Sequence, residues 1–446
     1  MSFTSAGRLL DQLSCGASLG ERGNVGDSSV FYHWRNPEAI KDYRSGVSLH
    51  SHTNQSRETL KFLAAIGSRY TFMRRLMQRL EQRSEANHGM RVDYEMSYWT
   101  PPMPPKLALD LESGQIENLG LAPIVSLTDH DSIQASLLLQ TLRDEDNSPT
   151  SVEWTVPYGS QTFHLGVHNL PRDRSCEWMQ ILASYTLHPS ARQLREILTA
   201  LHAEPEVLVV FNHPMWDLYR VGEELHIHLV NEFLRENRNW IHAIELNGLR
   251  NWKENRAALR LAEKWSMVFI SGGDRHGVEP NANINLTNAD CFDQFVHEIR
   301  YQKDSKILFM PQYAQPWKHR ILRSAIDAVS HYPQFPLSSQ RWDERVYHPD
   351  RSGVPRPLAA LWPDGTAPRA MQWSIAMLQL MGKGVFSSSL RIAWSEAREL
   401  RQTDPLMTSD DLSTVWIVGE VFEKDIANMQ PGSRVAVSAD PFPGQN

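Results

Sequence analysis

Two histidines one residue apart, His50 and His52, lie in the segment SGVSLHSHTNQSRETL at the end of a short apolar run. A neutral imidazole is a good ligand for zinc, iron or manganese, and alternate residues of an extended strand point to the same side. The two rings could therefore bind one metal ion. Two histidines at this spacing can equally lie on one solvated face, so the choice depends on the rest of the chain.

Seven short runs rich in β-branched or apolar residues predict the strands that would position such a pair. These runs span residues 47–52, 123–131, 151–156, 161–170, 207–214, 242–248 and 267–277. Amphipathic segments lie between several of them, and those at 190–203 and 251–265 predict helices. Alternating strands and helices indicate a parallel sheet or a barrel.

Almost every predicted strand carries a histidine or a carboxylate at or just beyond its carboxyl end. The residues in this position are His50, His52, Asp129, His130, His213, Glu245, Asp274 and His276, while Glu153 and His164 lie within their strands. The carboxyl ends of the strands of a parallel barrel form one face, where active sites lie. We therefore expect these distant residues to converge on one pocket.

Six ordered motifs resemble those of the PHP (polymerase and histidinol phosphatase) superfamily of metal-dependent phosphoesterases. They are LHSHT, LTDHDS, VEW followed by FHLGV, FNHP, IELNG and GGDRHG, and they span about residues 47–277. The resemblance implies an α/β fold, a distorted seven-stranded β/α barrel that holds two or three divalent ions of Mn, Zn or Fe. It does not cover the amino-terminal segment, residues 60–118 or the region after about residue 315.

The extent of these motifs predicts the domain organisation. We expect an N-terminal segment over residues 1–46, a PHP-like barrel over 47–314 with an insertion at about 59–118, and a partly helical C-terminal extension over 315–446. A basic helical pattern over residues 57–83 precedes an aromatic, proline-rich loop. This insertion could cover the pocket, or it could be a solvated helix with an ordinary connector.

The resemblance implies three groups of metal ligands that share one carboxylate. The first group is His50, His52, Glu153 and Asp274, the second is Glu153, His164 and His213, and the third begins with His130 and His276. The family completes the third group with an Asp or His five or six residues after the second histidine of the first motif.

This chain departs from the family pattern there, because it has Arg57 and Glu58 at the two positions. The carboxylate of Glu58 could be the missing ligand, since carboxylate oxygen suits zinc, manganese and iron. The guanidinium of Arg57 is cationic and could not. A centre with only two ions therefore stays open.

The chemistry implied by the resemblance is the hydrolysis of a phosphate ester. Two or three cations close together lower the pKa of a bridging water and neutralise the phosphate oxygens, so that a metal-bridging hydroxide can attack phosphorus. We expect catalytic roles for Glu153, Asp274 and His276. The substrate would be a small phosphorylated metabolite, a nucleotide or an oligonucleotide end.

Five further residues could support the ions or the substrate. Asp129, Asp131 and Glu245 are expected either to orient metal ligands or to be structural hydrogen-bond partners. Arg172 and Arg275 are candidates to bind an anionic substrate, because the guanidinium fork matches phosphate oxygens. Each arginine could instead be an ordinary surface charge.

Two other classes of function compete with the phosphoesterase. An amidohydrolase-type C–N hydrolase also begins with His-x-His on a barrel and ends with an Asp. Against it, the bridging position carries Glu153, the last motif is Asp-x-His, and TDHD has an obvious place only in the phosphoesterase pattern. A non-catalytic metal-binding barrel stays open because of the departure at Arg57 and Glu58.

Composition limits the partners that we expect. The 446 residues are 41% hydrophobic, which is enough for a sizeable core, and the formal charge of −7 gives no global basic field for nucleic acid. The three cysteines are widely spaced, which argues against a disulfide framework. We find no secretory signal and no run of about 18 apolar residues, so we expect a cytoplasmic protein that does not bind a membrane. The protein could form oligomers.

Overall fold

The computed structural model describes residues 28–60, 93–142 except 95, 148–337, 339–362, 366–367 and 369–383, together with isolated positions between 75 and 85. All of them belong to the first of the two units into which the chain divides, residues 1–400 and 401–446. Most of the basic helical pattern predicted at 57–83 and the end of the C-terminal extension lie outside the described residues.

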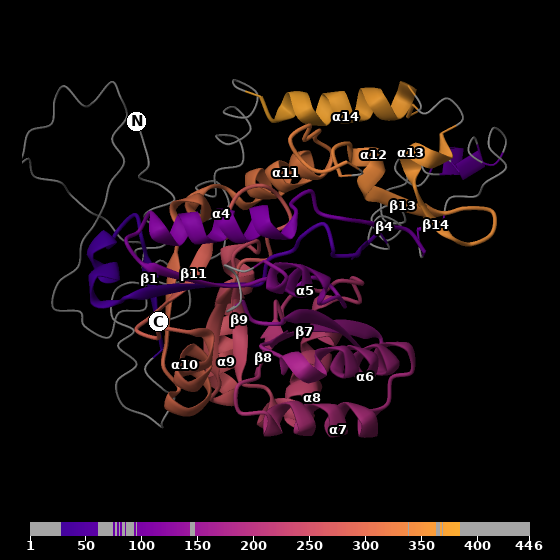
Figure 1. Cartoon of the computed structure of the whole chain (residues 1–446). Helices are drawn as coiled ribbons and strands as arrows, with labels where there is room; N and C mark the ends of the chain where they lie inside the picture. Colours follow the sequence, from indigo (N-terminus) through magenta and orange to yellow (C-terminus); the bar gives the residue numbers. More distant parts are fainter. Residues whose placement is uncertain are drawn as a thin grey trace, which may run out of the picture. The chain divides into compact units, whose positions relative to one another are not determined.

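The first sheet has five strands in the order β1-β12-β11-β2-β5 (Figure 1). In that order the strands span Ser28–Tyr32, Ser305–Phe309, Asn283–Thr287, Ser45–Leu49 and Ala122–Ser126. β2 and β5 are parallel, whereas β11 runs antiparallel to β2 and β12. The sequence patterns predict β2 and β5, but they miss β1, β11 and β12.

The second sheet has five strands in the order β10-β9-β8-β7-β6. These strands span Val268–Gly272, Ala243–Asn247, Leu208–Asn212, Gln161–His168 and Val152–Tyr158. β8, β9 and β10 are parallel, but β7 runs antiparallel to β6 and β8. Only two residues join β6 to β7, with Gly159 at a φ of 59°, and a parallel connection needs a dozen residues or more.

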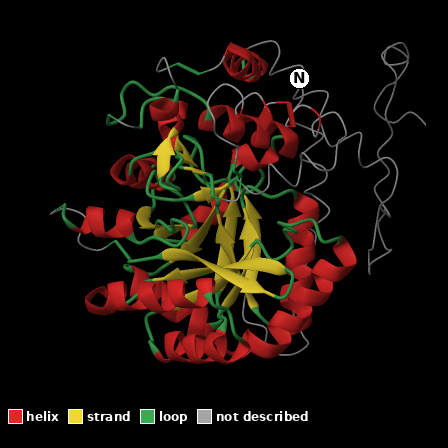
Figure 2. Cartoon of the chain, turned by 90° about the vertical axis from the view of Figure 1, so that its right-hand side faces the viewer, coloured by secondary structure: helices red, strands yellow, loops and turns green. Residues whose placement is uncertain are grey.

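All seven predicted strands are present, six of them shorter than their patterns and β6 one residue longer, and their hydrogen bonds do not form one closed barrel among the described residues. Instead, two isolated parallel bridges join the sheets, Ser51 with Arg275 and His130 with Glu153. Both bridges involve residues beside or within the predicted ligand set. Figure 2 shows the strands in the interior with helices around them. The fold is thus a mixed α/β structure whose two main sheets meet at the predicted ligands.

Helices cover both sheets, and the two predicted ones are present as α7 (Ala191–Ala203) and α9 (Trp252–Trp265). α7 begins at Ser190, whose side chain accepts a hydrogen bond from the amide of Gln193, as an N-cap does. The other α-helices of more than four residues in the described part of the chain are α4 (Pro105–Glu117), α5 (Gln134–Gln140), α6 (Ser175–Leu187), α8 (Glu223–Asn237), α10 (Phe292–His297), α11 (Trp317–Ala328) and α14 (Arg369–Met381).

Helix α4, from the predicted insertion, packs closely on β2 of the first sheet (Figure 1). The contact depends on Gly46, because a Cβ atom at this position would lie 2.8 Å from Cγ2 of Ile116. Ile116 is fully buried in a hydrophobic cluster that also contains Leu109 and Val125. The close approach brings the buried side chain of Glu112 on α4 next to the end of β2.

A third, small sheet combines the insertion with the C-terminal extension, in the order β14-β13-β4-β3. Its strands span Pro355–Pro357, Val346–Pro349, Tyr98–Trp99 and Glu58–Thr59. The helix predicted from residue 57 is therefore wrong at its start, because Glu58 and Thr59 pair with β4. Before β13, the buried Arg345 in the short helix α12 (Trp342–Arg345) donates hydrogen bonds to four backbone carbonyls.

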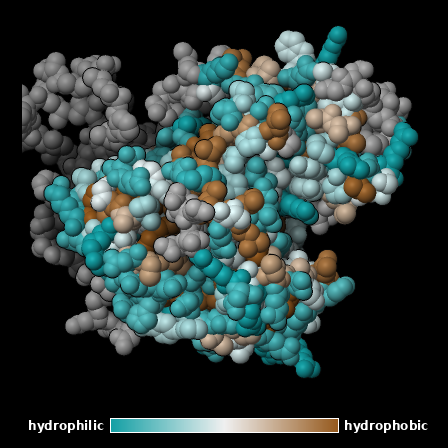
Figure 3. All heavy atoms as spheres, in the orientation of Figure 1, coloured by the Kyte–Doolittle hydropathy of each residue, from teal (hydrophilic) through white to brown (hydrophobic). Residues whose placement is uncertain are grey.

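Among the described residues on the face seen in Figure 3, hydrophilic ones predominate, with smaller hydrophobic patches between them. Within the described residues, no helix has both the length and the apolar character that crossing a membrane requires.

The core behind the second sheet should tolerate little truncation on α7. Leu198 is fully buried in the main hydrophobic cluster, whereas Arg195 on the same helix is exposed. We expect Leu198→Ala to lower the free energy of unfolding by about 2–5 kcal/mol, and Arg195→Ala to change it by about 0.5 kcal/mol or less. Chemical denaturation followed by circular dichroism would measure both. Equal effects of the two substitutions would contradict this packing.

Candidate metal centre

The carboxylate of Glu153 lies at the centre of the predicted ligands. Glu153 is the second residue of β6 and is fully buried. Its Oε2 lies 3.0 Å from His50 Nε2 and 3.3 Å from His52 Nε2. Its Oε1 lies 3.0 Å from His213 Nε2 and 3.5 Å from His164 Nδ1. His130 Nε2 also lies 3.2 Å from Oε2. The two oxygens thus face different sets of histidines, which is the arrangement of a carboxylate shared by two ions.

Asp274 completes the group around Glu153 Oε2. Its Oδ1 lies 3.7 Å from His50 Nε2 and 3.6 Å from His52 Nε2. A tetrahedral ion with ligand bonds of about 2.1 Å has ligand atoms about 3.4 Å apart. The separations of these four side chains lie close to that value. The two nitrogens that face Oε1 of Glu153, His164 Nδ1 and His213 Nε2, are 3.4 Å apart. This separation fits a second ion equally well.

Three atoms at this point are buried without a hydrogen-bond partner among the described residues: His50 Nε2, His52 Nε2 and Glu153 Oε2. Glu153 Oε2 lies 3.0 Å from His50 Nε2 and 3.3 Å from His52 Nε2, but not in the geometry of a hydrogen bond. Leaving a buried polar atom unsatisfied costs about 1–3 kcal/mol. A divalent cation between them would satisfy all three, so the side chains present fit a metal ion.

A third group of ligand atoms surrounds Glu58. Its Oε2 lies 3.3 Å from His130 Nε2 and 3.1 Å from His276 Nε2. His52 also has a ring nitrogen within reach of this group. Of the two residues at the position where the family has an Asp or His, the structure places Glu58 at the third group. The guanidinium of the exposed Arg57 lies instead over the ring of Tyr98.

The small third sheet carries Glu58 to this position. Glu58 lies on β3 opposite Trp99 of β4, and Trp99 in turn lies opposite Val346 of β13. The hydroxyl of Ser56 donates a hydrogen bond to Glu58 Oε1 over 2.6 Å and accepts one from the amide of His130. Pairing between residues so far apart in sequence leaves no local pattern, so the sequence could not predict the orientation of Glu58.

Glu245 orients two ligands from behind. Its Oε1 lies 2.5 Å from His50 Nδ1, and its Oε2 accepts a hydrogen bond of 2.6 Å from the amide of His213. Contact through Nδ1 turns the Nε2 of His50 toward Glu153, as is usual for histidines that bind metal. The carboxylate fits because residue 272 is a glycine: a Cβ atom on Gly272 would lie 1.6 Å from Glu245 Oε1.

Three of the predicted ligands follow the ends of strands and have unusual backbone conformations. His50, His213 and Asp274 have φ values of 62°, 27° and 58°. Positive φ is uncommon outside glycine and persists only where the surroundings impose it. Here the amide of Asp274 donates a hydrogen bond to the carbonyl of His50 over 2.6 Å. The chain turns immediately after β2, β8 and β10, and this turn directs the ligand side chains to a common point.

Asp129 and Asp131 hold loops rather than ligand atoms. Asp129 accepts hydrogen bonds from the amide and the hydroxyl of Thr53, over 2.5 and 2.7 Å, and so fixes the chain just after His52. Asp131 accepts one from the amide of Thr155 on β6 over 2.9 Å. Of the two expected roles, the structure places both carboxylates in structural hydrogen bonds.

The structure does not direct the two predicted substrate arginines to the ligands. Arg275 is buried, and its guanidinium donates to Glu112, Gly277 and His52, over 2.8, 2.8 and 3.1 Å. This buried ion pair ties the loop between Asp274 and His276 to α4.

Arg172 lies in a short 3-10 helix, Arg172–Arg174, where it is exposed and donates to the carbonyl of Ser148. This helix follows the end of β7, where His168 pairs with Leu208 at the start of β8. The ligand His213 follows the other end of β8, so the structure does not bring Arg172 to the centre.

Three residues beside the centre were missed by the sequence analysis: Asn247, Arg250 and Trp216. The amide of Asn247 donates hydrogen bonds to Glu245 and to Asp274 Oδ2, and the guanidinium of Arg250 donates to the same oxygen over 3.2 Å. The Arg250 guanidinium lies 3.8 Å from the centre of the Trp216 ring. The motif IELNG, which precedes Arg250 by two residues, was the signal that could have led to it.

Opposing effects set the protonation states of the ligands. Burial alone would raise the pKa of Glu153, but His130, His50 and His164 lower it well below its usual range. Burial lowers the pKa of His164 well below its usual range. Burial also opposes protonation of His130, but Glu153 and Glu58 raise its pKa to about 10. Without metal these carboxylates hold protons on neighbouring histidines, and a bound cation would displace them.

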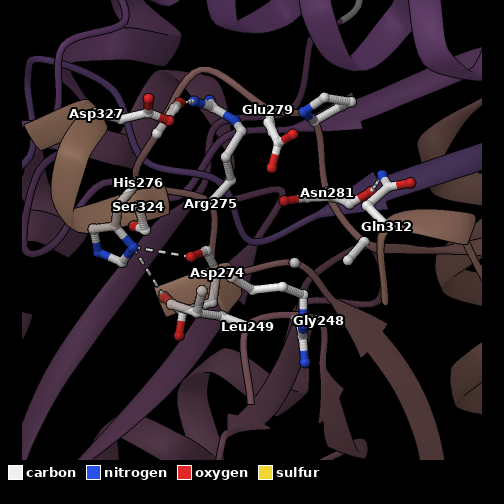
Figure 4. A pocket seen from close by; sticks show the side chains of 15 residues that line it. Gly248, Leu249, Asp274, Arg275, His276, Glu279, Asn281, Gln312, Ser324 and Asp327 are labelled. Atoms are coloured by element: carbon white, nitrogen blue, oxygen red, sulfur yellow. Dashed lines mark hydrogen bonds and ion pairs between the residues drawn. The ribbon is translucent and has the colours of Figure 1, made fainter. Parts of the chain in front are cut away.

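A pocket adjoins one edge of the ligand set (Figure 4). Asp274 and His276 are the only predicted metal ligands that line it, together with Glu279, Ser324 and Asp327, among others. His276 Nδ1 lies 2.9 Å from the carbonyl oxygen of Asp274, which only accepts, so this nitrogen is the donor. The Nε2 of His276 faces Glu58.

The shared carboxylate yields a test of the whole centre. We expect Glu153→Ala to lose at least two metal ions per chain, because each oxygen of Glu153 faces its own group. Elemental analysis of the purified protein, after loading with Mn²⁺ or Zn²⁺, would measure the loss. Glu224→Ala, on the exposed surface of α8, is the matched control and should keep the native content. Native metal content in Glu153→Ala would contradict the assignment.

The neighbours Arg57 and Glu58 provide an internal comparison for the third group. We expect Glu58→Ala to lose one ion per chain and to keep the ions around Glu153, because only the third group depends on Glu58. Arg57→Ala should retain every ion. The same elemental analysis applies, and an unchanged count in Glu58→Ala would show that this carboxylate is not a ligand.

Comparisons with known proteins give only remote similarities. No protein-family model matches the sequence, and no curated protein matches it. Similar solved structures include PsfC from Pseudomonas syringae, with 15% identity and a TM-score of 0.36 over 64% of this chain and 97% of that one. A protein from Bifidobacterium adolescentis described as a metal-dependent phosphoesterase has 13% identity and a TM-score of 0.29 over 44% and 91% of the two chains. An amidohydrolase from Chromobacterium violaceum has 14% identity and a TM-score of 0.30, and the match covers 52% of this chain and 88% of that one. The function therefore has to be argued from the site.

Proposed function

We propose that this chain is a metal-dependent hydrolase of phosphate esters with a centre of the PHP type. The observation that carries the proposal is the position of Glu153, whose two carboxylate oxygens face separate groups of ligand atoms while Glu58, His130 and His276 form a third group beside them. The strands β2, β5 and β6 to β10 would then correspond to the seven strands of the distorted barrel, with the bridges at Ser51 and His130 linking its two halves.

The proposed ligands combine imidazole nitrogen with carboxylate oxygen, a set that suits zinc, manganese and iron. Nine residues would hold two or three divalent ions: His50, His52, Glu58, His130, Glu153, His164, His213, Asp274 and His276. When bound, the ions would supply Lewis acidity and lower the pKa of water at the centre.

The charge of the ligand set favours an anionic substrate. Only three of the nine residues are carboxylates, and neutral histidines add no negative charge. Two or three divalent ions would therefore leave the centre with net positive charge at a place that is largely closed to water. A phosphate ester carries one or two negative charges and would compensate this excess, whereas a neutral amide would not.

The protein's own groups would keep the ligands in their reactive arrangement. Glu245 orients His50, while Asn247 and Arg250 hold Oδ2 of Asp274 so that its Oδ1 faces His50 and His52. The rings of His130 and His276 are partly exposed, unlike those of His50 and His52. We infer that substrate reaches the centre from this partly exposed side.

The proposal predicts hydrolysis of p-nitrophenyl phosphate that depends on bound metal. We expect a chelator to abolish turnover, and added Mn²⁺ to restore it in proportion to the ions regained. Two or three ions per chain should accompany full activity. Turnover that persists after all metal has been removed would contradict the mechanism.

Two outcomes would transfer the assignment to other functions. Metal binding with cleavage of C–N bonds, and no cleavage of phosphate esters, would identify the amidohydrolase-type alternative. A protein that takes up no metal even after refolding in Mn²⁺ or Zn²⁺ would be a non-catalytic barrel.

A further inference from the structure

Trp99 is an aromatic side chain that the small third sheet presents to the proposed metal centre. It lies opposite Glu58 in the register of β3 and β4, and residues directly opposite in an antiparallel pair project from the same face. Glu58 points to the third group of ligand atoms. The indole lies on the same side, since its ring centroid is 5.9 Å from that of His276, with 33° between the ring planes. Trp99 therefore borders the third group.

The two tyrosines of this sheet lie on its opposite face. Tyr98 precedes Trp99 on β4, so its side chain projects the other way. There it stacks on Tyr347 of β13, with ring centroids 4.8 Å apart and an angle of 8° between the planes. The guanidinium of Arg57 lies over the same Tyr98 ring. These three side chains pack with one another, so the packing of that face does not use Trp99.

The indole of Trp99 is not part of a hydrophobic core in the described part of the chain. It is partly exposed and belongs to none of the three hydrophobic clusters, whereas the partly buried Trp34 and Trp240 pack against the main one. Its N–H donates no hydrogen bond to a described residue, while those of Trp265 and Trp317 do. A large apolar ring with a free donor at the edge of a site is available to a ligand.

The open side of the centre is the side on which Trp99 lies. The rings of His130 and His276 keep 14% and 13% of their surface exposed, against 1% and 0% for His50 and His52. A phosphate group bound at the ions would therefore direct the rest of its ester toward His130 and His276. This leaving group would pass the indole that contacts His276.

Trp216, another indole near the ligands, has a different environment. The guanidinium of Arg250 lies 3.8 Å from the centre of the Trp216 ring, and the ring of His213 is nearly perpendicular to it, with centroids 5.1 Å apart. A cation thus occupies one face of this ring. Among the described residues no cation lies over the ring of Trp99, which leaves its face open to stacking.

The environment of Trp99 favours an ester with a planar ring. Such a ring gains affinity by stacking on an indole, whereas an aliphatic chain has no π-face to stack. We propose that Trp99 stacks on an aromatic ring of the leaving group, and that the substrates are phosphate esters of alcohols that bear such a ring, as nucleosides and aryl alcohols do. The inference rests on the proposed phosphoesterase function and deepens it. Trp99 lies in the inserted segment, which the family resemblance does not cover.

Phosphonates test the proposal without turnover, because an esterase does not cleave their C–P bond. The probes are benzylphosphonate, the methylene phosphonate analogue of AMP, and propylphosphonate, which has no ring. Isothermal titration calorimetry with the metal-loaded full chain would measure their affinities. We expect the native chain to bind both ring-bearing phosphonates more tightly than propylphosphonate. Equal affinity for all three would overturn the proposal.

Substitution of Trp99 assigns this preference to its side chain. We expect Trp99→Leu to weaken binding of the ring-bearing phosphonates about 5- to 100-fold, the effect of removing one stacking partner. Propylphosphonate should keep its native affinity. Trp373→Leu, on the exposed surface of α14, is the matched control and should bind all three probes like the native chain. Native affinities in Trp99→Leu would contradict the assignment.

Trp99→Phe separates stacking from positioning of the metal ligands, because phenylalanine keeps an aromatic face but lacks the N–H group. A preference for rings that Trp99→Phe retains and Trp99→Leu loses, both at full metal content, would support stacking. Metal loss in Trp99→Leu with equally weaker binding of all three probes would overturn it, since the indole would then act through Glu58 and His276.

The two ring-bearing probes distinguish the sources of the ring. Tighter binding of the AMP analogue would identify a nucleoside, and tighter binding of benzylphosphonate would identify an aryl alcohol. If the native chain prefers rings through Trp99 but cleaves no phosphate ester, the proposed function fails while the aromatic site stands. If it cleaves phosphate esters without this preference, the proposed function stands and the inference about Trp99 fails.

Discussion

The buried carboxylate of Glu153 is the constraint on which the centre depends. A charge removed from water is strongly unfavourable unless groups of opposite charge or hydrogen-bond donors surround it. Glu153 is fully buried, with histidines around it from β7 and from the residues that follow β2, β5 and β8. These elements belong to both main sheets, so the requirement to neutralise a single carboxylate brings the ends of the two sheets to one point.

Groups behind the ligands fix the ligand atoms in place. Glu245 contacts His50 and the chain at His213, and Asp129 fixes the loop after His52. The buried pair of Glu112 and Arg275 holds the loop that presents Asp274 and His276. Such pairs contribute little net stability, because desolvation offsets their attraction. Their consequence here is geometric: each ligand is held so that its free atom faces Glu153 or Glu58.

Segments outside the seven predicted strands complete the centre. Helix α4 supplies Glu112, and the third sheet places Glu58 through β4 and β13. The insertion and the C-terminal extension are therefore joined to the site, although no chemistry was expected of the extension. The same arrangement directs Glu58 inward to the third group of ligand atoms and leaves Arg57 on the outer, aromatic face.

The sequence by itself determined the candidate ligand residues and the strands that present them, because apolar runs and residue types that can bind metal are recognisable within short segments of the chain. It did not determine the antiparallel β7, the strands β1, β11 and β12, the orientation of Glu58, or the commitment of Arg275 to Glu112. Nor did it find Arg250 beside Trp216 and Asp274. Each of these depends on contacts between residues far apart in the chain, and no local periodicity records which distant partner a side chain will meet. Only the tertiary structure decided them.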